Sequence, residues 1–180
     1  MQFASATIKR VHRGEMDEAR ASLRETAQLN AQMTAAVAAS PEIGYGGFVA
    51  DATREYAEAA IVLALIADEG LPGPDDLEVN PAAWLNGLAD VAGELRRHVL
   101  DLIRQAKVHE AEAFLAAMDE IYQTIMSFDY PNAVTYGLRG RLDAVRGMVE
   151  RTRGDLTNAL RQARLEQRMA ELEERIGSQT

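Results

Sequence analysis

The chain has 180 residues, of which 47% are hydrophobic, and a formal net charge of −9. This length is sufficient for one domain with a substantial core, and the acidic balance excludes a protein that coats nucleic acid through general basic charge. Cysteine is absent, which excludes a disulfide framework and thiolate metal sites. The sequence shows no apolar signal segment and no membrane-spanning run, so we expect a soluble, cytoplasmic protein that has no membrane partner.

Helix formers dominate the chain and alternating strand patterns are missing, which predicts an all-α, single-domain bundle of about six to seven helices. The expected helices cover residues 3–13, 16–40, a segment that includes 55–67 and ends at Gly70, 84–105, 109–126, and a long tract from 138. Asn80 and Pro81 have the pattern of an N-cap and a first helical residue. The segments "SPEIGYGG" and "SFDYPNAVTYG" are predicted as loops.

The end of the long tract carries a separate apolar pattern. Its large apolar residues recur at alternating four- and three-residue steps and are Leu165, Met169, Leu172 and Ile176. This spacing is typical of a short coiled-coil seam, with Glu171 and Arg175 as a flanking i, i+4 pair. This tail either contacts another helix or packs back on its own subunit.

Two predicted helices carry paired acids in apolar surroundings. Glu55 and Glu58 are three residues apart and share one helical face, with Asp51 one turn earlier. Asp90 and Glu94 are four residues apart on the next long helix. A carboxylate near a core costs several kcal/mol unless a cation, a donor or a metal compensates it. We therefore expect the two helices to pack together with their acids converging.

The four acids Glu55, Glu58, Asp90 and Glu94 permit two interpretations. Facing carboxylates would form an oxygen-only cage suited to Mg²⁺ or Mn²⁺, and such an ion can activate water for attack on a phosphodiester. Alternatively, the acids form salt bridges with nearby arginines, and the candidates are Arg54, Arg96 and Arg97. Spacing does not decide between the two, because buried ion networks also concentrate acids.

Candidate phosphate contacts come from basic residues near these acids and from the first helix. Arg97 lies three residues after Glu94, where it could hold a phosphate beside a metal or form an ion pair with Glu94. The segment "KRVHRGE" forms a small basic cluster, for which a solvated helix end is the alternative. The predicted nucleic-acid contacts are Arg10, His12, Arg13, Arg54 and Arg97.

Five segments carry a family resemblance by their order: "IKRVHRGEMDEA", "REYAEAAIVLALI", "WLNGLADVAGELRR", "MDEIYQTIMSFDYP" and "LRGRLDAVRGMVERTRGDL". Together they resemble the translin family, and most closely its catalytic branch, translin-associated factor X, over residues 8–156. The resemblance implies an all-helical, translin-like domain over residues 1–156, followed by a helical extension over 157–180. It implies a closed homo-oligomeric shell, with an octamer favoured. It also implies binding of single-stranded RNA or DNA and metal-dependent RNA cleavage. The segment "GYGGFVADAT" departs from the basic, histidine-rich segment typical of translin.

The resemblance further assigns the catalytic and metal-binding roles to Glu55, Glu58, Asp90 and Glu94. The leading hypothesis is a Mg²⁺- or Mn²⁺-dependent endoribonuclease that cleaves single-stranded RNA inside a shell, and discriminates against a duplex too stiff to enter. One alternative is a non-catalytic shell that binds single-stranded nucleic acid. The other is an all-α nucleotide pyrophosphohydrolase, in which a Glu-x-x-Glu pair followed by a second acidic helix is a similar pattern.

Overall fold

Eight helices, two of them only four residues long, make up the part of the chain that the computed structural model describes, namely residues 2–44, 47–128, 131–135 and 137–177. They are α1 (Gln2–His12), α2 (Met16–Ala39), α3 (Pro41–Gly44), α4 (Gly47–Ile66), α5 (Pro81–Arg104), α6 (Glu110–Met126), α7 (Asn132–Thr135) and α8 (Leu138–Gly177). These ranges contain no strand. The all-α prediction is therefore confirmed.

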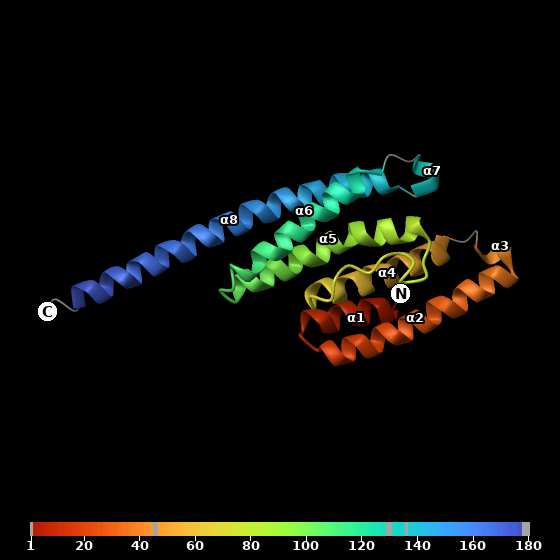
Figure 1. The fold of residues 1–180 in the computed structure, drawn as a ribbon, viewed down its shortest axis with the longest axis horizontal. Coiled ribbons are helices and arrows are strands. Elements are labelled where there is room, and N and C mark those ends of the chain that lie inside the picture. Colours follow the sequence, from red (N-terminus) through yellow and green to blue (C-terminus); the bar gives the residue numbers. More distant parts are fainter. Residues whose placement is uncertain (1, 45–46, 129–130, 136, 178–180) are drawn as a thin grey trace.

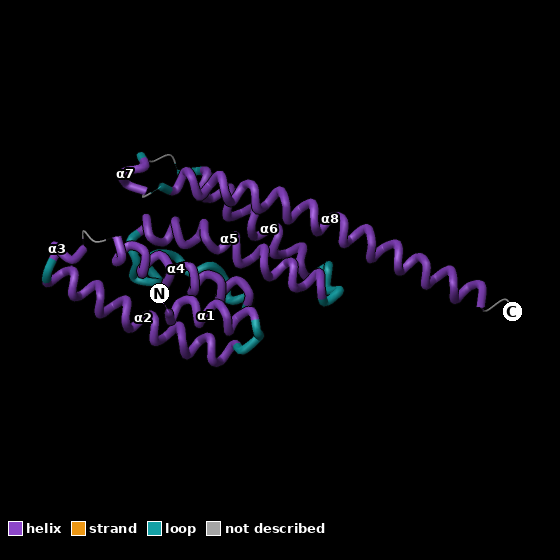
Figure 2. Tube along the Cα trace, turned by 180° about the vertical axis from the view of Figure 1, so that it is seen from behind, coloured by secondary structure: helices purple, strands orange, loops and turns teal. Residues whose placement is uncertain are grey.

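The helices form layers around α4 and α5, which pack directly against each other. Helices α1 and α2 cover one side of this pair, while α6 and α8 cover the other (Figures 1 and 2). Helix α4 is apolar around most of its circumference, and residues 59–64 are all buried, as expected for a central helix. No helix within the described ranges combines the length and apolar character needed to cross a membrane.

The ends of α4 and α5 follow from local chemistry. The Asn80 side chain accepts a hydrogen bond from the Ala83 amide at 2.8 Å, and Pro81 is the first residue of α5, so the predicted cap is confirmed. Helix α4 ends at Ile66, four residues before the predicted end at Gly70. Asp68 has a φ of 57°, and this left-handed backbone conformation cannot continue a right-handed helix.

Two segments predicted as loops contain short helices. The first, residues 40–47, includes α3 and the start of α4, and the second, residues 127–137, includes α7. Pro41 is the first residue of α3, and the Pro131 carbonyl accepts the amides of Val134 and Thr135 just before α7. Proline is preorganised for a first helical turn, so both segments fold into one turn. Residues 45, 46, 129, 130 and 136 lie outside the described residues.

Helix α8 has a packed half and a projecting half. Its N-terminal half contacts α5 and α6 up to Leu156, which is only 2% exposed. Leu160 and Ala163 are the last apolar residues of α8 that pack against the body. Beyond them the helix extends away from the other helices (Figures 1 and 2). This projecting half contains most of the predicted extension.

Candidate functional site

The backbones of α4 and α5 touch at the level of the paired acids. A Cβ atom at Gly87 would lie 2.9 Å from the Arg54 carbonyl oxygen and 3.0 Å from the Glu58 amide nitrogen. A Cβ atom cannot lie this close to backbone atoms, so only glycine at position 87 permits the observed distance between α4 and α5. Gly87 therefore lets the acid-bearing segments of the two helices lie directly against each other.

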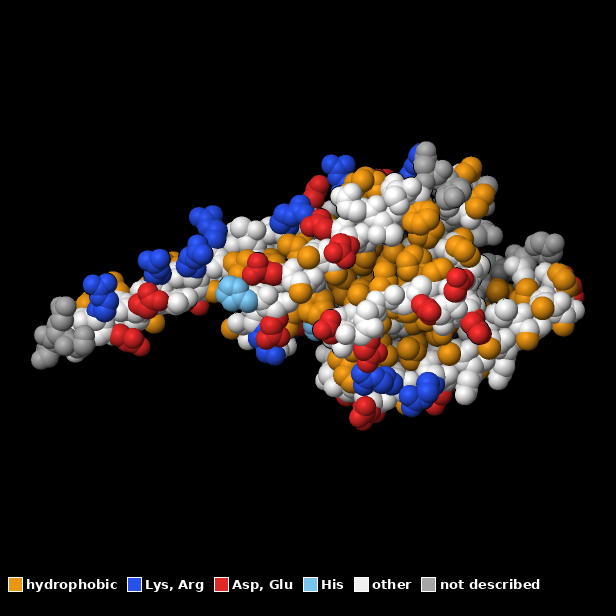
Figure 3. Space-filling model, in the orientation of Figure 1, with side chains coloured by type: hydrophobic (Ala, Val, Ile, Leu, Met, Phe, Trp, Pro, Cys, Tyr) orange, Lys and Arg blue, Asp and Glu red, His pale blue; other side chains and the backbone are white. Residues whose placement is uncertain are grey.

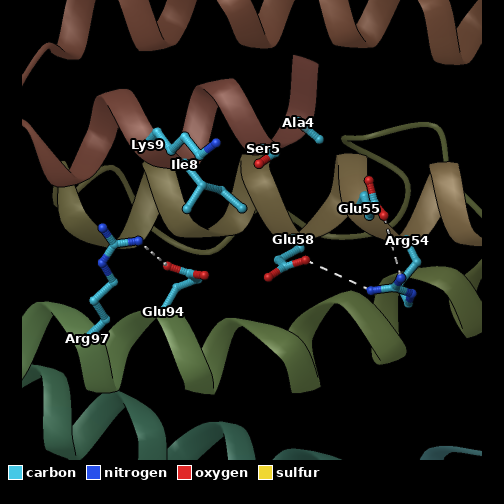
Figure 4. A pocket seen from close by; sticks show the side chains of 9 residues that line it. All are labelled: Ala4, Ser5, Ile8, Lys9, Arg54, Glu55, Glu58, Glu94 and Arg97. Atoms are coloured by element: carbon cyan, nitrogen blue, oxygen red, sulfur yellow. Dashed lines mark ion pairs between the residues drawn. The ribbon is translucent and has the colours of Figure 1, made fainter. Parts of the chain in front are cut away.

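A pocket of about 390 Å³ opens between α1, α4 and α5. Its lining residues are Ala4, Ser5, Ile8, Lys9, Arg54, Glu55, Glu58, Glu94 and Arg97. Figure 4 shows Glu58 and Glu94 near its middle, with Arg97 and Arg54 at opposite ends. The structure thus brings three of the four predicted acids to one pocket, beside two of the predicted phosphate-binding arginines.

The fourth acid, Asp90, is held by two arginines. Its carboxylate forms ion pairs with Arg54 from α4 and with Arg141 from α8. The Arg54 guanidinium also lies 3.9 Å from both the Glu55 and Glu58 carboxylates. Asp90 is therefore part of a salt-bridge network next to the pocket, which is the arrangement that the second interpretation of the acids predicts.

The partners of the other arginines differ from the sequence-based expectation. Arg96 was a candidate partner of the four acids, but it bonds Asp155 of α8 at 2.8 Å. Arg141 was not anticipated, because it lies 51 residues from Asp90 and reaches it only through the packing of α8 on α5. Arg97 lies 3.9 Å from Glu94, so the predicted ion pair forms at the edge of the pocket.

Glu58 has the most perturbed carboxyl group of the pocket. Its burial, followed by the nearby charges of Asp90 and Glu94, raises its pKa from 4.5 to about 7, although Arg54 opposes the shift. The side chain is 15% exposed. Glu58 therefore exchanges a proton close to neutral pH, a property that is common among acids in catalytic sites.

Glu94 has the opposite perturbation because of His12. The His12 Nε2 atom lies 2.6 Å from a Glu94 carboxylate oxygen, and this hydrogen bond lowers the pKa of Glu94 despite its burial. The His12 side chain is only 3% exposed, so it faces inward from α1, whereas Arg13 is exposed. The inward direction of His12 could have been predicted from the sequence, because His12 follows the apolar Ile8 by four residues and therefore lies on the same, buried face of α1.

The rest of the basic cluster lies at the end of α1. Arg13 is exposed and Arg10 is half-buried, and the residue of this cluster that lines the pocket is Lys9. Lys9 was not among the predicted contacts. Its position follows from helical periodicity, because Ser5 and Lys9 are four residues apart and both face the pocket.

The acids fit a divalent cation by their chemistry but do not form a closed ligand set. Carboxylate oxygens are the preferred ligands of Mg²⁺ and Mn²⁺. A cation would offset the burial and the neighbouring negative charges that raise the pKa of Glu58. Among the described residues, however, no group of three acidic or histidine side chains is arranged to hold one ion. Asp90 would have to exchange an arginine for a metal.

Comparison of the sequence and the fold with known proteins identifies the structural class of this chain. No family model matches the sequence. An uncharacterised protein of Methanocaldococcus jannaschii is 29% identical over 164 residues, which cover 90% of this chain and 72% of that protein. The structure of apo-NeC3PO has a TM-score of 0.80 at 18% identity, covering 88% of this chain and 82% of that one, which supports the fold alone. The chain is thus an all-α protein with a translin-like fold and a carboxylate-lined pocket.

Two further structures define the family. The crystal structure of AfC3PO and the structure of its complex with duplex RNA both have a TM-score of 0.82. They are 37% and 36% identical to this chain, and each match covers 91% of this chain and 84% of the other. The chain therefore belongs to the archaeal C3PO family of translin-like proteins. The resemblance to the translin family predicted from the sequence is confirmed.

Proposed function

We propose that the protein is a Mg²⁺- or Mn²⁺-dependent endoribonuclease that binds and cleaves single-stranded RNA within an oligomeric shell. One observation carries the proposal. Three carboxylates and three cationic side chains surround a single pocket, and burial with neighbouring charge raises the pKa of one of those acids to about 7. This combination suits phosphodiester hydrolysis, which needs both bound phosphate and groups that exchange protons near neutral pH.

The metal would be held by Glu55, Glu58 and Asp90, with Glu94 as a further ligand or as the base. When bound, such an ion orients the attacking water and neutralises charge on the phosphate. It would also reverse the local sign of an acidic pocket, which otherwise repels a polyanion.

The protein's own groups would supply phosphate binding and proton transfer. Lys9 and Arg97 line the pocket and would contact non-bridging phosphate oxygens, for which arginine provides a bidentate fork. The Glu94 carboxylate, kept ionised by the hydrogen bond to His12, would accept a proton from the attacking water. The Glu58 carboxyl, whose pKa is raised to about 7 in the metal-free pocket, would ionise as it binds the cation and so make metal binding depend on pH near neutrality, while a solvent water would protonate the leaving oxygen.

The oligomeric part of the proposal has independent support from surface chemistry. Large apolar side chains remain exposed on the body, among them Phe3, Phe48, Met126 and Val134. Figure 3 shows apolar side chains gathered over the middle of one face of the body. Apolar surfaces of this kind are typical of subunit interfaces, and closed symmetry is the usual outcome for a soluble homo-oligomer. We expect an octamer, which light scattering can measure.

The direct test is cleavage of three labelled substrates by the wild-type protein, with Mg²⁺, with Mn²⁺ and with excess EDTA. We expect cleavage of a single-stranded RNA oligomer only when a metal is present. AfC3PO forms a complex with duplex RNA, so we expect binding of a duplex of the same sequence, with slower cleavage. Nucleoside triphosphates should remain intact. Equal cleavage in EDTA would contradict the proposal, and turnover of the nucleotides alone would indicate a pyrophosphohydrolase.

A second function, a non-catalytic shell that binds nucleic acid, is favoured by one observation. Asp90 is already compensated by Arg54 and Arg141, so this acid has no need of a metal. In that case RNA would bind equally well in Mg²⁺ and in EDTA, and neither condition would support cleavage. The same experiment therefore separates the two functions.

A further inference from the structure

The projecting half of α8 presents a row of exposed apolar side chains. Leu165, Met169, Leu172 and Ile176 are 59%, 54%, 55% and 61% exposed. They recur at four- and three-residue steps, so they form a stripe along one side of the helix. A continuous apolar stripe on an exposed helix marks an interaction surface more often than scattered apolar residues do.

The stripe faces away from the protein's own body. Leu156, Ala159, Leu160 and Ala163 are the apolar side chains with which α8 packs against the body at this end. At 100° of rotation per residue, the centre of the apolar stripe lies about 160° around the helix axis from the centre of these four residues. The stripe is therefore directed away from its own subunit, where only a partner outside that subunit can cover it.

The charges beside the stripe select the partner and its orientation. In heptad notation Leu165 and Leu172 occupy d positions, and Met169 and Ile176 occupy a positions. The g positions then hold Arg161, Arg168 and Arg175, and the e positions hold Glu166 and Glu173. Figure 3 shows the basic side chains following one edge of the projecting helix.

In a parallel pair of identical helices, a g residue faces the e residue five positions later on the other helix. This rule pairs Arg161 with Glu166 and Arg168 with Glu173 of a second copy, in both directions. In an antiparallel pair, g faces g and e faces e, which would oppose arginine to arginine and glutamate to glutamate. The sequence of charges is therefore complementary to itself only in the parallel arrangement.

From this geometry we infer that the end of α8 binds the same segment of a second copy of the chain as a parallel, two-helix coiled coil. Isoleucine at an a position and leucine at the d positions favour two strands. The inference goes beyond the proposed function and does not depend on it, because none of these residues lines the acid pocket.

The 180 residues include no cysteine, which permits a clean test with a single introduced thiol. In a parallel coiled coil, Leu172→Cys places two identical d positions opposite each other within disulfide reach. Mild oxidation should then give a covalent dimer on a non-reducing gel. The matched control is Glu174→Cys, which lies at an f position on the outer side of the helix and should remain monomeric on the same gel.

The charge pattern is tested in the Leu172→Cys background. Reversal of Arg161 and Arg168 to glutamate places like charges opposite each other and should reduce the disulfide yield at least several-fold. Additional reversal of Glu166 and Glu173 to arginine should restore the yield. A Leu172→Cys yield no higher than that of Glu174→Cys would overturn the inference. A yield that does not respond to the charge reversals would overturn the parallel pairing.

Discussion

Gly87 is the residue whose substitution tests most directly how α4 and α5 are packed at the acid pocket. In Gly87→Ala, the new Cβ atom would lie 2.9 Å from the Arg54 carbonyl oxygen and 3.0 Å from the Ala57 Cβ and the Glu58 amide nitrogen. These neighbours are backbone atoms or a short side chain, so none can rotate away. Relief of the overlap requires the two helices to move apart.

The expected magnitude follows from two opposing terms. Overpacking in a tight interior costs about 1–3 kcal/mol. Replacing glycine by alanine inside a helix gains about 0.8–1 kcal/mol from helix propensity. Gly93→Ala, on the same helix, provides a matched control because its nearest neighbour is the Met148 sulfur at 3.8 Å. The propensity gain cancels between the two variants, so Gly87→Ala should be less stable than Gly93→Ala by about 1–3 kcal/mol.

Urea denaturation followed by circular dichroism measures this difference in the free energy of unfolding. All variants should be compared at one protein concentration, because assembly adds to apparent stability. We expect Gly93→Ala to unfold at or above the wild-type midpoint and Gly87→Ala below it. If Gly87→Ala were as stable as Gly93→Ala, the helices would not be in backbone contact at the acids, and the geometry of the pocket would be wrong.

Three further predictions concern individual side chains of the site. The folded-state pKa of Glu58 is raised from 4.5 to about 7. As the pH rises from 4.5 to 7, ionisation of this largely buried group therefore lowers the free energy of unfolding, by up to about 3 kcal/mol. Glu58→Gln should therefore be more stable than wild type at pH 8 in urea denaturation and equal to it near pH 4, and a constant difference would refute the shift. His12→Ala should slow RNA cleavage about 10–100-fold with little change in RNA affinity, whereas an unchanged rate would show that His12 does not position Glu94. Asp90→Asn should abolish turnover and retain the oligomer seen by light scattering; full activity would leave Asp90 with a structural role only.

The features predicted from the sequence are those set by local patterns. Helix α5 could be located because Asn80 and Pro81 form a start signal within a few residues. The pairs Glu55–Glu58 and Asp90–Glu94 could be found because three- and four-residue spacing fixes a shared helical face. The short helices α3 and α7 were missed because a single helical turn has little intrinsic stability and leaves only a weak signal.

The contacts that decide the electrostatics of the site could not be predicted. Arg141 meets Asp90, and His12 meets Glu94, across 51 and 82 residues of sequence. The first depends on how α8 packs against α5, and the second on how α1 packs against α4, which places His12 within reach of α5. These contacts give the acids different environments. Asp90 is compensated by arginines and Glu94 by His12, whereas the burial of Glu58 and the nearby acids favour its neutral form.

The central claim is that the acid pocket catalyses RNA cleavage, and single-turnover cleavage of a labelled single-stranded RNA by Glu58→Gln in Mg²⁺ tests it most directly. Glutamine has the shape of a protonated glutamate, so the fold and the oligomer should persist. Glu25→Gln, an exposed position on α2, is the control and should cleave at the wild-type rate. We predict that Glu58→Gln lowers the cleavage rate by at least about 10–100-fold, because it removes an anionic metal ligand, with RNA affinity within a few-fold of wild type. Cleavage by Glu58→Gln at the wild-type rate would contradict the claim.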